Sequence, residues 1–200
     1  SITPMAESDK QIDRELTGFV PDTLITNLNP EHLKSSGDIT ITKNGEFQFQ
    51  HQAAHEETFV VKVTFDNPSI PVLSHWWSYG IAFGANTSEF SVFRLSSNNT
   101  WDFFEQRKDI STAMVMGNLP GLTFAQETSN TLVLLISNGR LMAWVNGSPI
   151  GRNEIPKISI IPGQVWLTAA VGTYDDQLME ESDLSIHFRD VRVWNLTNAE

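Results

Sequence analysis

An uncharged, aromatic-rich stretch between residues 67 and 88 is the first place where this chain could do chemistry. It contains no Asp, Glu, Lys or Arg, but it does contain His75, Trp76, Trp77 and Tyr79. An exposed indole beside polar groups suits sugar recognition, because the apolar C–H face of the ring packs on the indole while directional hydrogen bonds fix the hydroxyls. In an extended segment Trp76 and Trp77 point to opposite faces, so we expect one in the core and one outside.

Trp101 extends this candidate platform, with Asp102 and Arg107 close to it in sequence. A β-domain of this size also needs large side chains to fill its core, so we expect at least half of the aromatic residues to be structural. The predicted ligand-binding set is His75, Trp76, Trp77, Tyr79, Trp101 and Arg107.

An acidic segment at residues 173–183 carries five carboxylates in eleven residues. Hard oxygen ligands on a loop suit Ca²⁺, although the Gly-containing spacing of an EF-hand is missing. We predict Asp175, Asp176, Glu180 and Glu181 as candidate calcium ligands. A solvated charge cluster is the alternative.

His51 and His55 are four residues apart, and on a helix this spacing would present two imidazoles to one metal ion. The order of residues matches neither the H-E-x-x-H nor the H-x-x-E-H motif. Because the segment falls between predicted strands, we expect a polar inter-strand loop here rather than a metal site.

The composition restricts the classes of partner. The chain has 200 residues, 24 acidic and 13 basic, so its net charge is -11, and it has no Cys. Disulfides and thiolate metal sites are excluded, and nucleic acid is an unfavourable partner because its phosphates require clustered Lys and Arg. No segment reaches the ~18 consecutive apolar residues of a membrane span. Absence of Cys fits an exported protein and a cytosolic one equally; we expect an extracellular or cell-surface location, and the oligomeric state is not predicted.

The elements that must position these residues are mostly strands. Residues 1–36 form a loop-rich N-terminal arm, in which Ser8 and Gln11 predict the capping box of a short helix. After Gly37 the hydrophobic period becomes two, which predicts a domain over residues 37–200. Asn44-Gly45 predicts a hairpin joining residues 39–41 to 47–49. Further strands are expected at residues 59–65, 79–83, 90–95, 101–105, 164–171 and 184–194.

The strongest local pattern is a pair of Asn-Gly turns, at residues 138–139 and 146–147. They predict a three-stranded meander with type I′ turns, in which Ile136 opposes Leu141 and Leu135 opposes Met142. Both faces of this hairpin are apolar, so its second face should be covered or should line a groove.

Near the C-terminus the alternation of apolar residues shifts by one position between Phe188 and Val191. One uninterrupted strand cannot bury both residues on the same side of a sheet. We therefore predict a bulge at Arg189-Asp190. Together these patterns predict an all-β sandwich.

The order of several segments resembles the concanavalin A-like lectin/glucanase superfamily, and is most similar to its laminin-G-like and keto-disaccharide-hydrolase-like branches. The segments are residues 79–83 (YGIAF), 90–95 (FSVFRL), 130–134 (NTLVL), 145–147 (VNG), 165–172 (VWLTAAVG) and 188–194 (FRDVRVW). The resemblance implies a jelly-roll β-sandwich of two antiparallel sheets, but it does not imply an activity.

A retaining glucanase of this superfamily would need paired carboxylates on one strand. Glu181 and Asp183 approach that pattern, but Ser185 occupies the third carboxylate position. We therefore expect a non-catalytic recognition module for carbohydrate or glycoprotein. The alternatives are a hydrolase of the keto-disaccharide type, with Glu180, Glu181, Asp183 and His187 as its first candidates, or a protein-binding domain of a larger surface protein.

Overall fold

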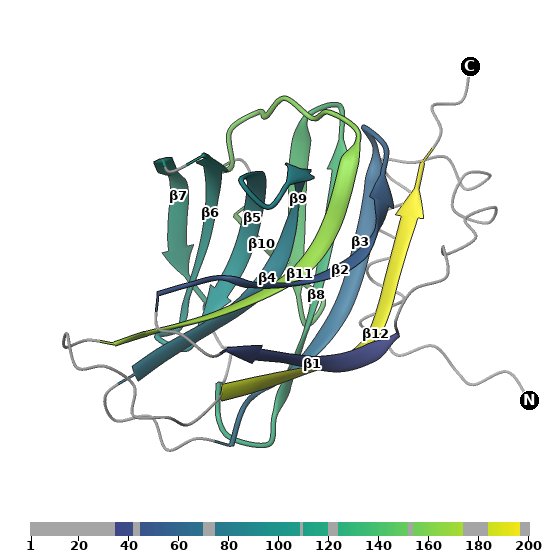
Figure 1. Cartoon of the computed structure of the whole chain (residues 1–200). Coiled ribbons are helices and arrows are strands. Elements are labelled where there is room, and N and C mark those ends of the chain that lie inside the picture. The colour runs from purple at the N-terminus through teal and green to yellow at the C-terminus, as the bar shows by residue number, and fades with distance from the viewer. Residues whose placement is uncertain are drawn as a thin grey trace, which may run out of the picture.

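The computed structural model describes residues 35–41, 45–69, 75–108, 110–119, 124–151, 154–173 and 184–196, and the predicted arm helix lies outside them. Two six-stranded antiparallel sheets face each other (Figure 1). Sheet A has the order β1 (Ser36–Ile41), β12 (Leu184–Asn195), β3 (Phe59–Asp66), β8 (Ser129–Ser137), β9 (Arg140–Val145) and β10 (Ser148–Ile150). Sheet B has the order β2 (Gln48–His55), β11 (Gly163–Thr173), β4 (His75–Asn86), β5 (Glu89–Ser96), β6 (Thr100–Arg107) and β7 (Ile110–Asn118). No helix of the described part is long and apolar enough to cross a membrane.

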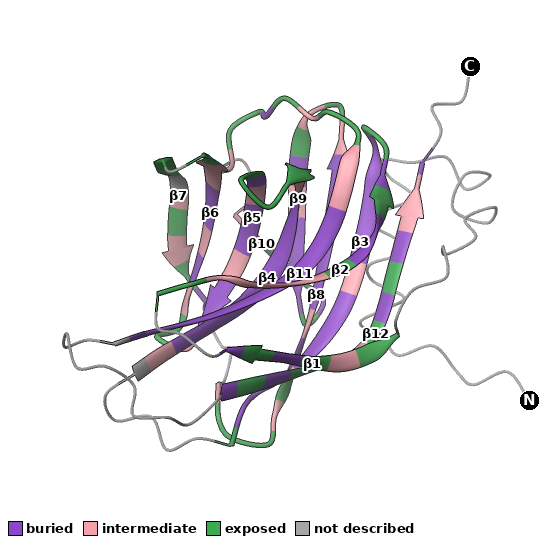
Figure 2. Ribbon diagram, viewed as in Figure 1, coloured by how far each residue is buried: buried purple, intermediate pink, exposed green. Residues whose placement is uncertain are grey.

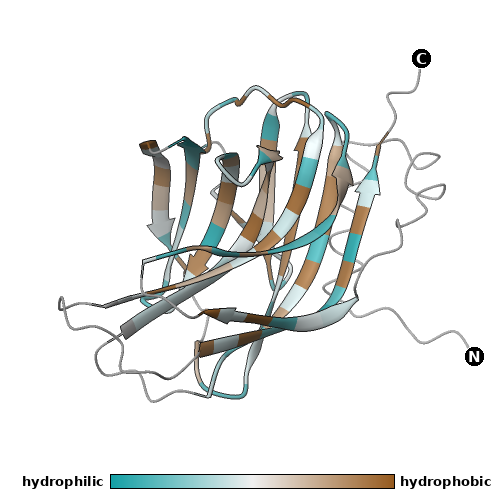
Figure 3. Ribbon diagram, viewed as in Figure 1, coloured by the Kyte–Doolittle hydropathy of each residue, from teal (hydrophilic) through white to brown (hydrophobic). Residues whose placement is uncertain are grey.

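The core lies between the sheets, because each strand sends alternate side chains inward. On β3 the inward residues are Phe59, Val61, Val63 and Phe65, all with no exposed surface. The Phe65 ring stacks on the Tyr79 ring of sheet B with 4.5 Å between centroids. The alternation is visible along β12, where buried and exposed segments follow one another (Figure 2) and coincide with changes in hydropathy (Figure 3). The predicted all-β jelly-roll sandwich is confirmed.

The meander is confirmed in register and in turn type. Ile136 pairs with Leu141 and Leu135 with Met142. Asn138 and Gly139 have φ of 52° and 72°, and Asn146 and Gly147 have 50° and 80°, as type I′ turns require. The second face is mostly covered: Val133, Leu135 and Trp144 are buried in a cluster with Val60 of β3 and Leu196, and Met142 is half-buried against it.

The bulge in the last strand is also confirmed. The register of β12 against β3 shifts between Arg189 and Arg192, and Asp190 has φ 55°. The extra residue allows both Phe188 and Val191 to point into the core, where they are 0% and 5% exposed.

The hairpin predicted at Asn44-Gly45 is wrong. Gly45 has the expected positive φ of 76°, but β1 pairs with β12 in sheet A and β2 pairs with β11 in sheet B. The Gly45 N–H donates to the Val171 carbonyl at 2.9 Å, so the chain passes from one sheet to the other at this point. A turn signal specifies local backbone geometry, and it does not specify which strand receives the hydrogen bonds.

The prediction of a polar loop at residues 51–55 is wrong as well, since β2 continues to His55. His51 pairs with Trp166 while Ala53 pairs with Val165, so Gln52 is an extra residue, a β-bulge. Beyond it, the side chains that faced outward face inward, and the reverse. His51 is therefore exposed on the outer face, while His55 is 2% exposed in the core, its ring centroid 4.2 Å from that of Phe59. The two imidazoles lie on opposite faces and cannot share a metal ion.

Gly80 is required where β4 passes β5. A Cβ atom at this position would lie 2.1 Å from the Phe93 carbonyl oxygen and 2.9 Å from the Arg94 Cα. Both are backbone atoms of the paired strand, so neither can move aside without separating the two strands. The outer face of β4 therefore tolerates no side chain at residue 80.

We expect Gly80→Ala to lower the free energy of unfolding by about 3 kcal/mol, as overpacking against backbone does. Gly45→Asn is the matched control: nothing lies within 4 Å of a Cβ there. Asn accepts a positive φ, so the control should cost less than about 1 kcal/mol. Urea unfolding measures both, and equal losses would contradict the close approach at Gly80.

The pH dependence of stability should report on His55. Burial lowers the pKa of His55 below its ordinary value of 6.5 and outweighs the opposing contributions of the Glu56 carbonyl and carboxylate. Below pH 6.5 the unfolded chain therefore binds a proton that the folded chain resists, and the free energy of unfolding falls as the solution is acidified. His55→Phe should show a smaller loss between pH 7.5 and 5 in urea titrations, and an unchanged loss would contradict this assignment.

Candidate functional site

The outer face of sheet B carries the strongest candidate site, and its strand register arranges the side chains in three rows. An apolar row contains Trp166, Ala82, Val92 and Phe104. The middle row contains Thr168, Gly80, Arg94 and Asp102. The third row contains Ala170, Ser78, Ser96 and Thr100. The central strands β4 and β11 thus carry mainly small residues on this face, which leaves room above them.

Aromatic rings from both sides of the sheet fill that room. Phe47, which directly precedes β2, lies 5.6 Å from Phe104 on β6, and Phe49 lies 5.1 Å from Phe90 on β5. In a flat sheet β2 and β6 would be roughly 19 Å apart, four steps of about 4.8 Å. The outer face is therefore concave, and the rings reach across the small residues of its middle strands.

Arg94 and Asp102 form an ion pair at the centre of this concave face. The Arg94 Nε donates to Asp102 Oδ1 at 2.9 Å, and Nη2 donates to Oδ2. The two side chains are 16% and 17% exposed. The fork geometry of the pair fixes the guanidinium plane, and three of its five N–H groups are left for other acceptors.

Three rings surround the guanidinium. The Arg94 Cζ lies 5.5 Å from the Phe47 ring centroid, 5.6 Å from that of Trp76 and 5.2 Å from that of Phe104. These distances are within the range of cation–π attraction. The charged group is therefore held in a fixed orientation by aromatic contacts as well as by its carboxylate.

Two hydroxyl groups of this face have no hydrogen-bond partner among the described residues. Ser78 and Thr168 have no exposed surface, and their Oγ and Oγ1 atoms are unsatisfied. An unpaired buried hydroxyl costs about 1–3 kcal/mol. Thr168 lies in the same row as Arg94 and Ser78 in the next row, so the concave face contains polar groups that its own described side chains do not satisfy.

Trp76 is the predicted aromatic residue that reaches this site. Its half-buried indole lies against Gly172, where a Cβ atom would be 2.3 Å from the ring. His75, at the start of β4, pairs with Thr173, but its side chain is outside the described part. The expectation that one of the adjacent tryptophans is core and the other outside is correct.

Trp77, Tyr79 and Trp101 lie in the core, 2%, 0% and 3% exposed, and their assignment to the ligand site is corrected accordingly. They occupy the inward positions of β4 and β6, where a large side chain fills the space between the sheets. Arg107 is exposed at the end of β6, with its Nη2 3.5 Å from Glu105. The register places Arg107 nine residues from Trp76 along the strand direction, about 30 Å, so these two predicted residues do not form one platform.

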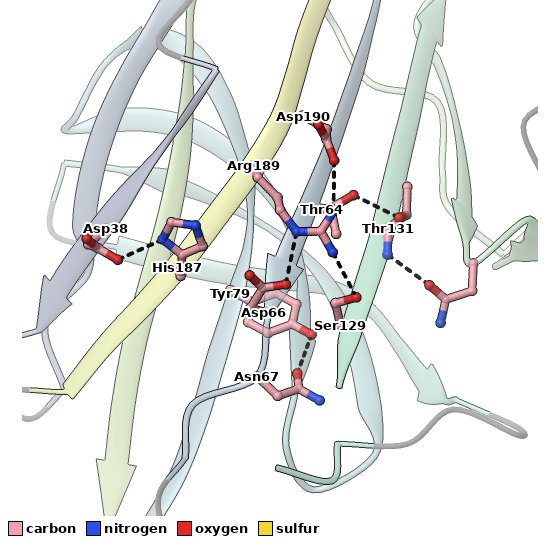
Figure 4. A network of polar contacts seen from close by, with 11 residues as sticks. Asp38, Thr64, Asp66, Asn67, Tyr79, Ser129, Thr131, His187, Arg189 and Asp190 are labelled. Atoms are coloured by element: carbon pink, nitrogen blue, oxygen red, sulfur yellow. Dashed lines mark hydrogen bonds and ion pairs between the residues drawn. The ribbon is translucent and has the colours of Figure 1, made fainter. Parts of the chain in front are cut away.

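Tyr79 instead anchors a buried polar network, part of which is drawn in Figure 4. Its hydroxyl donates to Asn67 Oδ1 at 3.0 Å and accepts from Asn130 Nδ2 at 2.7 Å. Asn146 Nδ2, in the second Asn-Gly turn, donates to Asn130 Oδ1 at 2.8 Å. Burial raises the pKa of Tyr79 well above its ordinary value, so the phenol stays protonated.

A second polar region lies on the outer face of sheet A (Figure 4). His187 Nδ1 is 2.9 Å from Asp38 Oδ1, and Arg189 donates to Asp66 at 3.3 Å and to Ser129 at 3.3 Å. A hollow of about 530 Å³ adjoins these residues. His187 is the described member of the predicted hydrolase set; Glu180, Glu181 and Asp183 lie outside the described residues.

The predicted calcium ligands Asp175, Asp176, Glu180 and Glu181 also lie outside the described residues, so that prediction is untested. Within the described part, no group of three or more His, Asp or Glu side chains is placed to hold a metal ion.

Sequence reasoning named Asp102 as a neighbour of Trp101, but it missed Arg94 and the ion pair between Arg94 and Asp102. Both occupy outward positions of predicted strands, and the turn of Ser97 to Asn99 between β5 and β6 puts them opposite each other. Opposite charges at mirrored positions around a turn were the available signal. Phe47 and Phe49 fall in the segment predicted as a strand at residues 47–49, but their position over sheet B depends on the pairing of β2 with β11.

No family model and no curated protein matches the sequence. Among solved structures, the chain is similar to carbohydrate binding module CBM66 from Bacillus subtilis, with 9% identity, a TM-score of 0.57 and coverage of 82% of this chain and 98% of that one. It is similar to a native glycosidic hydrolase with 9% identity, a TM-score of 0.52 and coverage of 86% and 82%. It is also similar to the laminarinase catalytic domain from Thermotoga maritima MSB8, with 11% identity, a TM-score of 0.50 and coverage of 82% and 78%.

A binding module and hydrolases share this architecture, so the likeness shows the fold and leaves the activity to the site. At the level of the fold, these likenesses agree with the jelly-roll β-sandwich that the sequence resemblance implied.

Proposed function

We propose that the chain is a non-catalytic carbohydrate-recognition module that binds its ligand on the concave outer face of sheet B. The observation that carries this proposal is the Arg94–Asp102 pair, fixed among the Phe47, Trp76 and Phe104 rings. Sugars present C–H faces and hydroxyls together, and an aromatic surface with an oriented polar pair complements both.

The chemistry of the pair favours a neutral polyol. Arg94 offers N–H donors and Asp102 offers acceptor lone pairs, so one sugar hydroxyl can accept from the first while another donates to the second. Because the charges of the pair compensate each other, the site does not require a charged ligand. This supports carbohydrate over a phosphate-bearing partner for this face.

The distribution of carboxylates supports binding rather than hydrolysis. A glycosidase of either stereochemistry uses two carboxyl groups on opposite sides of the scissile bond. On the described strands of the concave face, Asp102 is the one carboxylate at an outward position, and Arg94 engages it. A single carboxylate, with both of its oxygens already engaged by Arg94, does not supply the pair that hydrolysis uses.

We expect Arg94→Gln to weaken oligosaccharide binding at least tenfold, because it removes both the charge-assisted donors and the partner that orients Asp102. A glycan array would identify the strongest ligand, and isothermal titration calorimetry with that oligosaccharide would measure the loss. Arg192→Gln, an exposed arginine on sheet A, is the matched control and should bind like the parent chain. An array without signal, or equal affinities for both variants, would refute the proposal.

A second prediction tests the position of Trp76. Gly172→Ala places a methyl group where the Trp76 ring now lies and must tilt the indole outward. We expect this variant to bind the same oligosaccharide several-fold more weakly while its urea midpoint changes little, because the half-buried ring can move. Trp76→Phe should retain part of the affinity. Unchanged binding by Gly172→Ala would show that the indole does not contact the ligand.

A further inference from the structure

The two Asn-Gly turns of sheet A have the same backbone geometry but differ in what holds the asparagine side chain. Asn138 and Gly139 have φ of 52° and 72°, and Asn146 and Gly147 have φ of 50° and 80°. Both are two-residue type I′ turns, the first between β8 and β9 and the second between β9 and β10. They form a matched pair in which the effect of the side-chain surroundings can be compared directly.

The Asn146 side chain is fixed at both of its polar atoms. Its Oδ1 accepts from the Thr131 N–H at 2.8 Å, and its Nδ2 donates to Asn130 Oδ1 at 2.8 Å. The Asn146 backbone N–H also donates to the Thr131 carbonyl at 2.8 Å. Asn130 has no exposed surface, and Gly147 is buried as well. The Asn146 amide therefore cannot rotate without breaking hydrogen bonds to the interior of the protein.

The Asn138 side chain is exposed and makes no hydrogen bond to any residue that the structure describes. Gly139 is half-buried, and within the same described ranges its N–H donates no backbone hydrogen bond. The Asn138 amide can therefore turn toward the Gly139 nitrogen without losing an interaction. Because glycine has no Cβ, no side chain on residue 139 obstructs the approach of its nitrogen to the Asn138 Cγ.

Positive charge lies close to Asn138. Lys157 lines the same hollow as Asn138, Gly139 and Glu57, and a Cβ atom on Gly139 would lie 3.3 Å from the Lys157 Cε. Arg140 shares a neighbouring hollow with Asn138 and Lys157. In the described part of the chain neither cation forms an ion pair with a carboxylate. Nearby cations favour the ionised form of an acidic group, and so they favour both a deprotonated Gly139 nitrogen and a carboxylate at residue 138.

We propose that Asn138 is a site of spontaneous deamidation, whereas Asn146 is protected by its hydrogen bonds. The Gly139 nitrogen loses its proton and attacks the Asn138 Cγ, which forms a succinimide ring while the side-chain nitrogen leaves as ammonia with that proton. Water then opens the ring at either carbonyl, which produces a carboxylate and restores the backbone N–H. The products are aspartate and isoaspartate, in which the side-chain carbon has entered the backbone. Water is the only co-reactant.

The reaction changes the end of the β8–β9 hairpin in two ways. It adds a negative charge beside Arg140 and Lys157, and in isoaspartate it lengthens the backbone by one carbon. A type I′ turn joins its strands through two ordinary residues, so the longer connection no longer fits this geometry. The pair next to the turn, Ser137 and Arg140, is the first to be affected. The change lies on sheet A, and the inference is independent of carbohydrate binding on sheet B.

The test is to age the intact chain in mildly alkaline water labelled with oxygen-18 and to analyse its tryptic peptides by mass spectrometry. Trypsin cuts after Arg140 and after Arg152, so the two Asn-Gly sequences fall in different peptides. The label marks each ring opening during the incubation, and electron-transfer fragmentation distinguishes isoaspartate from aspartate. Because Asn146 must first break two side-chain hydrogen bonds, we expect Asn138 to react at least tenfold faster. Equal rates, or a faster reaction at Asn146, would overturn the proposal.

The same incubation in guanidinium chloride is the matched control, since unfolding removes the turns and their hydrogen bonds together. We expect the two sites to react at similar rates there, because both are Asn-Gly sequences. If the difference between the sites persists in the unfolded chain, sequence rather than structure causes it and the proposal is wrong. If neither site reacts in the folded chain while both react in the unfolded one, the turn itself protects Asn138 and the proposal is also wrong.

Two variants test the individual contacts. Asn130→Ala removes the acceptor of the Asn146 amide and should raise the rate at residue 146, while the rate at residue 138 stays that of the parent chain. Lys157→Gln should slow the reaction at residue 138 several-fold without affecting residue 146. An unchanged rate at residue 146 in folded Asn130→Ala would refute protection by the hydrogen bonds. If circular dichroism shows that this variant does not fold, the comparison of the folded and unfolded parent chain decides the question.

Discussion

The close approach of β4 to β5 is the constraint on which the candidate site depends. Gly80 sits with its backbone so near Phe93 and Arg94 that a single methyl group would collide with the neighbouring strand. Gly80, Ala82 and Gly84 occupy successive outward positions, so β4 has almost no side-chain bulk on the outer face along this strip in the middle of sheet B. Large side chains from the flanking strands lean over this strip, and the face becomes concave. The depth of the site therefore results from residues that have almost no side chain.

That geometry also explains why a charged pair is stable near the centre of the face. Arg94 is held by Asp102 through two hydrogen bonds and by three aromatic rings, so its positive charge is compensated where water has limited access. Beneath the same layer, the hydroxyl groups of Ser78 and Thr168 have no hydrogen-bond partner among the residues that the structure describes. A face built for stability alone would carry apolar residues of similar size at these positions. Oriented polar groups beside aromatic rings are what the proposed binding of a ligand with hydroxyl groups would use.

The two sheets use their outer faces differently. Sheet B concentrates aromatic and paired charged groups in one concavity. Sheet A buries an apolar cluster around Trp144 at one end of its outer face and carries the network of Asp66, His187 and Arg189 at the other. The buried hydrogen bonds of Tyr79, Asn67 and Asn130 connect the sheets, so both candidate regions are built on one rigid core.

The sequence alone determined what depends on residues close together in the chain: the alternating strands, the type I′ turns at Asn138-Gly139 and Asn146-Gly147, and the bulge at Asp190. In each case the backbone preference of a few neighbours decides the outcome. Only the tertiary structure decided which sheet each strand joins, so the Asn44-Gly45 hairpin was wrong and the parity reversal at Gln52 was missed. The tertiary structure also decided which aromatic side chains are exposed. By residue type alone, Trp77, Tyr79 and Trp101 could lie on a surface or in a core, and it is the packing of the opposite sheet that buries them. Arg94 and Asp102 became a site for the same reason: their significance comes from rings on strands distant in sequence, and no local pattern encodes that contact.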